Sequence, residues 1–420
     1  MPSLNSENLK KSIFLMPALF LFSNTWADVV VSVIAILFLF HSGNRKNWEW
    51  TKRPWVIAAL SLWVYAITIC SPLAVYPGAS FETTLFIRFI LFGAALAYWI
   101  LQDKTAKKWF EYGVVAVIVF IIIDCFYQAH FGEDLLGFTK TKNRLTGPFG
   151  NGEFVPGGFV TKLIFIALAS IFCATKFKSL LTRTTLLLSS MVVVLVFVFL
   201  TGERAPLVSF LLSCAIVLTG LFVLYPRLRF LLLSGCVAMI ISVGIIKTLN
   251  PVMYQRSVST ILENVTDMEN SVYVNIPKSA IDIWINTPET NIFTGVGLRN
   301  YRTIINLTEN ANIKDRYKIS AIDNIHHTHN IYIEWLVGAG IIGLIGFSTM
   351  VLLLLKDLIW HNIYSTKSAL PLFATAAFMT AFWPLVPSVN YFTNKHAVIV
   401  WMTVGWALAV TMKKKNKNTS

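Results

Sequence analysis

Three of the seven histidines of the chain stand within four positions, in the run Asp323-Asn-Ile-His326-His327-Thr328-His329-Asn330. A neutral imidazole is the usual general base near neutral pH, and it is also a common metal ligand. Carboxylates that would complete a metal site are sparse nearby, and His327 and His329 share a face only where the backbone is extended. The cluster therefore favours catalysis or substrate contact over a metal site. The plainer alternative is a set of polar residues at a helix entrance, with Asn330 near the cap.

Arginines at the edges of apolar segments are the second chemical feature. Arg204 stands in the short turn Thr201-Gly-Glu-Arg204-Ala-Pro206, which opens a new apolar segment. A helix N-terminus offers N–H groups and partial positive charge, and arginine adds a bidentate fork, so this turn suits a phosphate or carboxylate. The alternatives are a salt bridge with Glu203 and a side chain that snorkels to the interface. Arg88 lies within the apolar run 82–101, where a charge is costly and indicates function.

Two more basic residues lie in the same kind of position. Arg144 belongs to the Gly-rich segment 143–152, whose backbone either wraps an anion or forms a plain turn. Lys162 lies near the start of the next apolar segment, from which its side chain can snorkel outward. With Arg204 and the histidines, these cations suit an anionic, lipid-anchored substrate at one face of a membrane.

The run Gly338-Ala-Gly340-Ile-Ile-Gly343 matches a dinucleotide-binding pattern as text. That pattern binds a pyrophosphate only where a strand leads through a tight turn into a helix N-terminus. Here the glycines are expected inside an apolar helix, and small residues at such spacing let membrane helices approach closely. The sequence therefore predicts helix packing at this run and no nucleotide site.

The elements that must position these residues are membrane helices. The chain has 420 residues, of which 55% are hydrophobic and 13% charged, and its mean hydropathy is +0.64. Soluble proteins carry about 25% charged residues. Apolar runs recur along the chain without the alternation of barrel strands, so helices with internally satisfied backbones are expected. The predicted fold class is all-α, a polytopic membrane protein.

A bilayer span takes about 20 apolar residues, and twelve segments approach that length. They are 12–24, 28–41, 55–72, 82–101, 109–130, 154–174, 184–201, 205–225, 229–247, 330–355, 368–386 and 395–411. The first two are short and are expected to form a tight hairpin. Lys and Arg accumulate in the loops that a cytoplasmic N-terminus places inside, which sets the orientation. The basic C-terminal tail reads as a span flank, so no nucleic-acid partner is expected.

One outer loop, 250–329, is much longer than the others. Loops beyond about 12–15 residues usually carry function or structure of their own. Within it, 279–286 predicts an amphipathic helix with Ile281, Trp284 and Ile285 on one side, which either lies on the membrane or covers the bundle. The predicted divisions are a transmembrane bundle of about nine helices over 1–249, the periplasmic loop with short helices over 250–329, and C-terminal helices with a basic cytoplasmic tail over 330–420.

These motifs resemble those of the bacterial O-antigen ligases and their polymerase relatives. His329-Asn330, followed after nine residues by Gly340-x-x-Gly343, is similar to the most specific signature of that family. Thr201-Gly-Glu-Arg204-Ala resembles its short outer turn with an essential arginine, and Arg144-Leu-Thr-Gly-Pro-Phe-Gly resembles another outer segment. The stretch from Pro288 through Gly295-Val-Gly297 to Tyr301 resembles the segment that precedes the family's histidine.

The resemblance implies a metal-independent, inverting glycosyltransferase of GT-C architecture, with no cofactor, at the periplasmic face of the bacterial inner membrane. The donor would be a glycan on undecaprenyl diphosphate, the acceptor a sugar of the lipid A core, and membrane lipids would surround both. By carry-over, His329 would be the general base, and Arg204 would bind the diphosphate and stabilise the leaving group.

The chain departs from the family pattern at one position. Tyr273 stands in the neighbourhood where many ligases carry an additional arginine, so Arg256, Arg299 or Arg302 is expected to take over that role. The residues expected to contact substrate are Arg88, Arg144, Arg256, Arg299, His327 and Asn330.

Two other functions fit parts of the sequence. A polymerase would use the same donor with another lipid-linked glycan as acceptor, and the histidine motif favours the ligase over it. A flippase or other transporter would show broken helices, repeats and charges near the midplane. This chain shows no repeat, and its polar residues gather at the outer edge.

Overall fold

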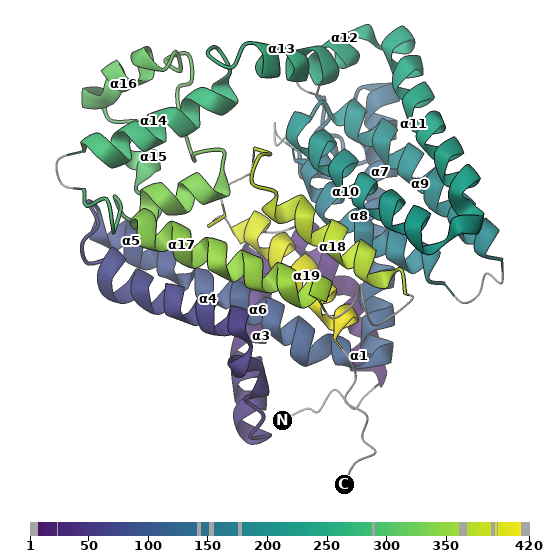
Figure 1. The fold of residues 1–420 in the computed structure, drawn as a ribbon, viewed down its shortest axis with the longest axis horizontal. Helices are drawn as coiled ribbons and strands as arrows, with labels where there is room; N and C mark the ends of the chain where they lie inside the picture. The colour runs from purple at the N-terminus through teal and green to yellow at the C-terminus, as the bar shows by residue number, and fades with distance from the viewer. Residues whose placement is uncertain are drawn as a thin grey trace.

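The computed structural model describes residues 7–22, 24–140, 144–150, 155–174, 179–287, 290–360, 368–387, 391–392 and 394–412. These residues form a helical bundle that carries a layer of shorter helices at one end (Figure 1). The chain folds in this way because its apolar runs satisfy their own backbone hydrogen bonds only as helices.

Seven helical segments of the described chain are long and apolar enough to cross a membrane. They are α3 (Asn24–Asn44), the run Pro77–Gln102 with α5 (Pro77–Thr83) and α6 (Ile87–Tyr98), α7 (Lys104–Phe131), α9 (Leu180–Thr201), α10 (Arg204–Leu224), α11 (Arg229–Leu249) and α17 (Ile331–Trp360). Four shorter apolar segments contain α4 (Pro54–Tyr65), α8 (Pro156–Phe172), α18 (Leu370–Phe382) and α19 (Asn394–Thr411). The seven and the four coincide with eleven of the predicted spans, and the prediction of a polytopic all-α membrane protein is confirmed.

The first predicted span, 12–24, is not one helix. The structure divides it into α1 (Glu7–Ser12), a 3-10 turn (Ile13–Leu15) and α2 (Met16–Phe22). Pro17 stands in the first turn of α2, where proline suits a helix start but has no N–H to continue a helix from the preceding turn. The prediction of two short spans is therefore corrected to a broken first segment followed by one long helix, α3.

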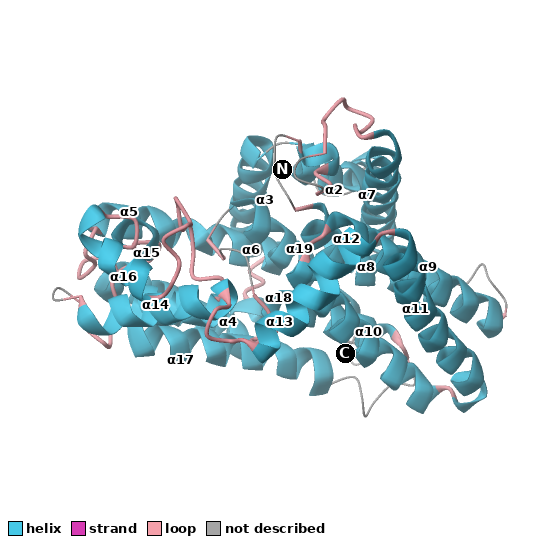
Figure 2. Ribbon diagram, turned by 90° about the horizontal axis from the view of Figure 1, so that it is seen from above, coloured by secondary structure: helices cyan, strands magenta, loops and turns pink. Residues whose placement is uncertain are grey.

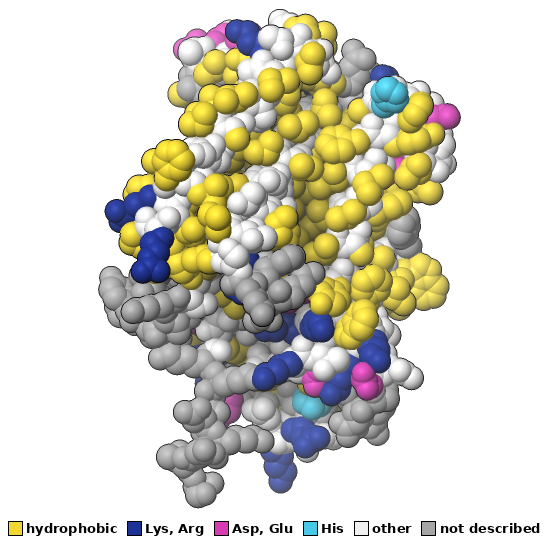
Figure 3. Space-filling view, turned by 90° about the vertical axis from the view of Figure 1, so that its right-hand side faces the viewer, with side chains coloured by type: hydrophobic (Ala, Val, Ile, Leu, Met, Phe, Trp, Pro, Cys, Tyr) yellow, Lys and Arg dark blue, Asp and Glu magenta, His cyan; other side chains and the backbone are white. Residues whose placement is uncertain are grey.

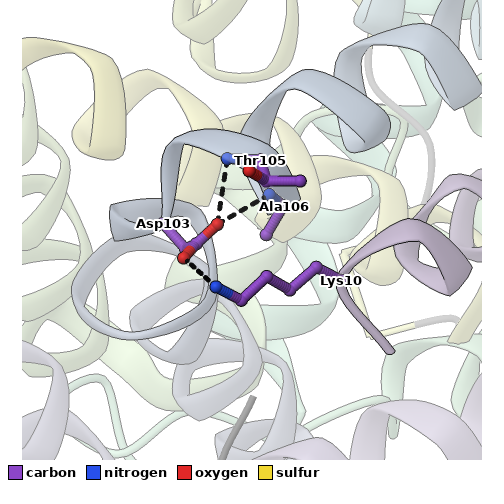
Figure 4. Close-up of polar contacts among 4 residues, drawn as sticks. All are labelled: Lys10, Asp103, Thr105 and Ala106. Carbon is purple, nitrogen blue, oxygen red and sulfur yellow. Dashed lines mark hydrogen bonds and ion pairs between the residues drawn. The ribbon is translucent and has the colours of Figure 1, made fainter. Parts of the chain in front are cut away.

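The start of α7 is tied to the N-terminal helix (Figure 4). One carboxylate oxygen of Asp103 accepts the backbone N–H groups of Thr105 at 2.9 Å and Ala106 at 3.0 Å, which caps α7. The other oxygen forms a 2.7 Å ion pair with Lys10 of α1. The hydrogen bond from Lys10, together with those from the backbone of α7, lowers the pKa of Asp103.

Helices from both halves of the chain pack together in the middle of the bundle. α18 contacts α8, α10 and α19, and α19 also contacts α6 and α3 (Figures 1 and 2). α6 and α19 approach closely because Gly93 and Gly405 have no Cβ. An added Cβ would lie 2.8 Å from the Trp401 ring at Gly93 and 2.7 Å from Leu96 at Gly405. Small residues of this kind permit tight helix packing in membranes. The central helices of the bundle are therefore closely packed.

α11 presents apolar side chains outward. Phe230, Ile240 and Leu249 are 84%, 71% and 80% exposed. Figure 3 views the molecule from the side on which α11 lies, and hydrophobic side chains cover most of that face, with Lys and Arg mainly toward its lower end. Soluble proteins rarely expose apolar surface so continuously. This face therefore lies against lipid.

The long loop folds into short helices with a small core of its own. They are α12 (Pro251–Tyr254), α13 (Thr260–Thr266), α14 (Val272–Asn286), α15 (Tyr301–Ile304) and α16 (Ala311–Arg316). α14 begins before the predicted helix 279–286, and it buries Ile276, Ala280 and Ile283 in the core of the loop. Of the predicted apolar side, Trp284 packs partly on this core and Ile285 is 53% exposed. The helix covers the bundle through its other face, against Val337 of α17.

α17 is broken at Gly340, where φ is 69° and ψ is −168°. Segment 291–297 of the long loop docks at the break through three main-chain hydrogen bonds: Val296 N–H to Val337 O at 2.9 Å, Gly297 N–H to Gly338 O at 3.0 Å, and Ile341 N–H to Ile292 O at 3.1 Å. A Cβ at Gly340 would lie 2.1 Å from the carbonyl oxygen of Phe293. The prediction of a continuous helix is therefore wrong at Gly340, where glycine admits a loop backbone. The prediction of close helix packing holds at Gly346, which faces Leu62 of α4.

Candidate functional site

One cavity gathers most of the residues that the sequence singled out. It has a volume of about 300 Å³ and lies where α8, α10, α18 and α19 meet the long loop. Its lining includes six basic residues named from the sequence: Arg144, Lys162, Arg204, Arg256, His327 and His329. Ala205, Pro206, Ala397 and Val400 form apolar parts of the wall. The cavity thus combines a cationic surface with an apolar one, as a lipid-linked anion requires.

The turn between α9 and α10 presents Arg204. Gly202 ends α9 in the left-handed region with φ 68°, and its N–H donates to the carbonyl of Phe199 at 3.0 Å. Arg204 is then the first residue of α10, where the helix dipole favours an anion. Its guanidinium lies over the ring of Tyr273 in α14, 5.2 Å from the ring centroid. This cation–π contact holds the guanidinium over the ring.

Glu203 binds the start of α8. Its two carboxylate oxygens accept the N–H of Gly157 at 2.6 Å and the N–H of Gly158 at 3.1 Å. Gly157 permits this approach, because a Cβ there would lie 2.9 Å from Glu203 Oε1 and 2.7 Å from Thr201 Oγ1. Burial raises the pKa of Glu203 to about 7, although these two hydrogen bonds and the charge of Arg144 act in the opposite direction. The alternative of a structural Arg204–Glu203 salt bridge does not describe this turn.

Arg144 and Arg256 bring further positive charge to the cavity. Burial lowers the pKa of Arg144; Glu203 partly offsets that effect, and the like charges of Arg256 and Arg204 add to it. Arg256 packs on the α9–α10 turn, since a Cβ at Gly202 would lie 3.2 Å from its Nε. That Nε is buried and has no hydrogen-bond partner among the described residues. The cavity is therefore lined by four cations, Lys162 included, and by the carboxylate of Glu203. This excess of positive charge attracts an anion.

His329 also contacts the ring of Tyr273. Its ring centroid is 5.8 Å from that of Tyr273 in an edge-to-face arrangement, and 4.2 Å from that of His327. Burial lowers the pKa of His329 to about 4, so the imidazole is neutral at pH 7. Its φ of 56° lies in the left-handed region, which costs a non-glycine residue about 1–3 kcal/mol and is common at functional sites. Tyr273 thus connects the arginine turn with the histidine.

Three residues expected to contact substrate are not among those that line the cavity. Arg88 of α6 forms a 2.8 Å ion pair with Asp28 of α3. Asn330 caps α17: its Oδ1 accepts the N–H groups of Tyr332 and Ile333, and its Nδ2 donates to the Pro384 carbonyl at 2.8 Å. Arg299 is considered below.

The sequence singled out neither Glu203 nor His396 as a site residue, and it named Tyr273 only as a departure from the family. Each carried a signal. Glu203 adjoins Arg204 in a short turn between two apolar segments, where a charged side chain needs a partner. His396 is a titratable residue in the first turn of a predicted span, where such residues mark function. The contacts of Tyr273 depend on α14 packing against a distant turn, and sequence spacing does not encode that packing.

The comparison with known families bears directly on this cavity. Residues 189–348 match the family model described as O-antigen ligase. Over this segment the chain is similar to the O-antigen ligase family. Among curated proteins, none matches the chain.

The O-antigen ligase family comprises membrane enzymes, ligases and polymerases of the glycosyltransferase type, that act on lipid-linked polysaccharide. The matched segment contains Arg204, Arg256, Tyr273 and both cavity histidines that precede α17. Arg144, Lys162 and His396 lie outside it and reach the same cavity from the flanking helices and loops. The candidate site is therefore built from the family segment and from both sides of the chain around it.

Proposed function

We propose that this protein is an O-antigen ligase that transfers a polysaccharide from undecaprenyl diphosphate to a sugar of the lipid A core at the periplasmic face of the inner membrane. The observation that carries the proposal is the single cavity in which a neutral His329 shares the Tyr273 ring with Arg204. A base and a diphosphate clamp must lie within one substrate length of each other, and this arrangement meets that requirement.

Diphosphate binding follows from the charges. Arg204, Arg256 and Arg144 supply guanidinium groups, which bind phosphate oxygens in a bidentate way. Lys162 adds a point charge, and the apolar wall of Ala397 and Val400 suits the first isoprene units of the lipid. In a buried site these cations stabilise the charge that develops on the leaving group. Glycosyl transfer would then proceed without a metal or other cofactor.

The transfer step uses the neutral imidazole of His329. The hydroxyl of the acceptor attacks the anomeric carbon of the donor from the face opposite the diphosphate, so the configuration inverts. The new glycosidic C–O bond forms as the bond between that carbon and the diphosphate oxygen breaks, and His329 takes the hydroxyl proton. The bound diphosphate places negative charge near the imidazole, which raises its basicity when it is needed.

The break in α17 does not support the alternative that the protein is a transporter. In transporters, interrupted helices expose backbone groups to a substrate cavity. At Gly340 the backbone groups are satisfied by segment 291–297 of the same chain. A polymerase would use the same donor cavity, and it differs from a ligase in the acceptor.

The test is His329→Ala in a cell that makes O-antigen, with the membrane level of the protein checked. A ligase predicts folded protein, uncapped lipopolysaccharide and accumulated lipid-linked polymer. Normal lipopolysaccharide would remove His329 from the mechanism. A core that carries single repeat units would identify the polymerase. Transfer by purified protein should survive EDTA, and a loss that a divalent ion restores would contradict the metal-independent reaction.

A further inference from the structure

Glu334 is a buried carboxylate that the transfer step does not use. It lies in the first turn of α17 and is 6% exposed. Its Oε2 accepts the backbone N–H of Thr328 at 3.3 Å. It also lies 3.2 Å from the Thr328 hydroxyl, whose one proton is shared with the Asn330 carbonyl at 2.8 Å. Thr328 is completely buried and directly precedes His329. The carboxylate is therefore fastened to the residue next to the base.

His329 needs support of this kind because of its backbone conformation. A non-glycine residue at φ 56° persists only where its neighbours hold it. Asn330 holds the following side, since it caps α17 and also donates to the Pro384 carbonyl. Glu334 holds the preceding side through Thr328. Both clamps originate on α17, so the first turn of this helix fixes the backbone on either side of the histidine.

Helix formation alone does not account for Glu334. The N-terminus of α17 already has its cap in Asn330, whose Oδ1 accepts from Tyr332 at 2.9 Å and Ile333 at 3.2 Å. Burying a carboxylate is costly unless it is hydrogen-bonded and its charge is balanced. The hydrogen bonds come from Thr328, and a source of positive charge is required in addition.

Arg299 interacts electrostatically with Glu334. Burial and the like charge of Arg302 lower the pKa of Arg299, and the carboxylates of Glu334 and Glu82 act against these effects. The Nε of Arg299 is buried without a hydrogen-bond partner among the described residues. Arg299 itself has φ 60°, so its backbone is also held in a conformation that non-glycine residues rarely adopt. Its position outside the cavity is consistent with a charge that acts on Glu334.

We propose that Glu334 is a positioning residue for His329: it holds Thr328 so that the imidazole faces the cavity beside Tyr273. This inference rests on the proposed role of His329 as the base.

The experiment compares Thr328→Val, Thr328→Ser and Glu334→Gln in purified full-length protein with lipid-linked donor and core acceptor. Valine keeps the shape of threonine and removes the hydroxyl, whereas serine keeps the hydroxyl. Misplacing a catalytic group by about 1 Å costs up to about 100-fold, so Thr328→Val should lower kcat by about 10–100-fold. The KM for donor should stay within about twofold, because the cationic residues are untouched, and Thr328→Ser should restore most of kcat.

Two further variants complete the design. Thr184→Val is the matched control, since Thr184 is a buried threonine of α9 whose hydroxyl donates to the Leu180 carbonyl away from the cavity. Its kcat should equal that of the unaltered protein. His329→Ala tests the underlying function in the same assay. Folded protein is quantified for each variant by thermal unfolding.

The outcomes separate the two claims. If His329→Ala transfers normally, the proposed base is wrong, and the positioning role falls with it. If His329→Ala is inactive while Thr328→Val and Glu334→Gln both keep kcat, only the positioning role is overturned. A Thr328→Ser variant as impaired as Thr328→Val would also overturn it, because the hydroxyl would then not matter. If Thr328→Val fails to fold, the Thr328→Ser and Glu334→Gln values decide.

Discussion

Acidification from pH 7 to pH 5 should leave His329 neutral in the donor-free protein. Burial lowers its pKa from 6.5 to about 4, a difference of about 2.5 units that corresponds to about 3.4 kcal/mol against the protonated form. At pH 5 about 9% of His329 would be protonated, whereas an ordinary histidine would be about 97% protonated at that pH. The base should therefore remain competent well below the usual histidine range.

The assay is the pH dependence of glycan transfer by purified protein. The acid limb of kcat/KM reports groups in the free enzyme, and the contribution of His329 should appear only near pH 4, well below the pKa of about 7 of Glu203. The acid limb of kcat reports the complex, in which the donor diphosphate adds negative charge beside the imidazole. That charge favours the protonated imidazole, so the kcat limb should lie at higher pH than the kcat/KM limb.

The matched control is His326→Ala, because His326 is exposed and belongs to the same cluster. This variant should leave both limbs unchanged. An acid limb of kcat/KM near pH 6.5 that is present in both proteins and that Glu203→Gln does not shift would refute the reasoning, because the catalytic base would then be a solvated histidine. Protein stability must be followed in parallel, since the lowered pKa of His329 also means that folding stability falls as pH drops from 6.5 toward 4.

Three further changes test other parts of the structure. Arg256→Gln should raise the KM for donor by about 10–100-fold, because a charge-assisted hydrogen bond contributes about 1.5–3 kcal/mol. Arg88→Gln should leave that KM unchanged. Equal effects of the two variants would contradict the placement of Arg88 outside the cavity. Gly340→Ala should lower both the unfolding temperature and the activity, since its Cβ would overlap the Phe293 carbonyl; an unaltered melting curve would show that the loop docks elsewhere. Asp103→Ala should destabilise the protein by about 0.5–2 kcal/mol at pH 7. Because the pKa of Asp103 is lowered on folding, this difference should vanish in unfolding scans as the pH falls through that pKa, and a difference that persists there would assign it to packing.

The membrane helices were predictable because one rule governs them. A backbone in hydrocarbon must satisfy its own hydrogen bonds, so each long apolar run indicates a helix. The prediction failed where a single residue overrode that rule, as Pro17 does in the first segment. It failed again at Gly340, because a helix can be interrupted in an apolar run when another part of the chain supplies the missing hydrogen bonds. That partner, segment 291–297, is distant in sequence.

The candidate site was predictable as a set of residues and less so as an arrangement. Arg144, Arg204, Arg256 and the histidines were named from their types and positions, and they line one cavity. Arg88 was named because a charge in a span usually marks function, but its position opposite Asp28 depends on how α3 packs on α6. Glu334 was not named at all. A glutamate in an apolar run signals a partner, and only the fold shows that the partner is Thr328.

The docking of segment 291–297 at the break in α17 has a consequence for biogenesis. A ribosome produces this segment before α17, and α17 before α18 and α19, so the loop can dock at Gly340 only after α17 has been made. Asn330 obtains its Pro384 contact later still, when α18 is in place. The backbone that holds His329 is therefore completed near the end of synthesis. A chain that stops before α18 therefore contains the arginine turn but lacks the Pro384 contact and the cavity wall that α18 and α19 form.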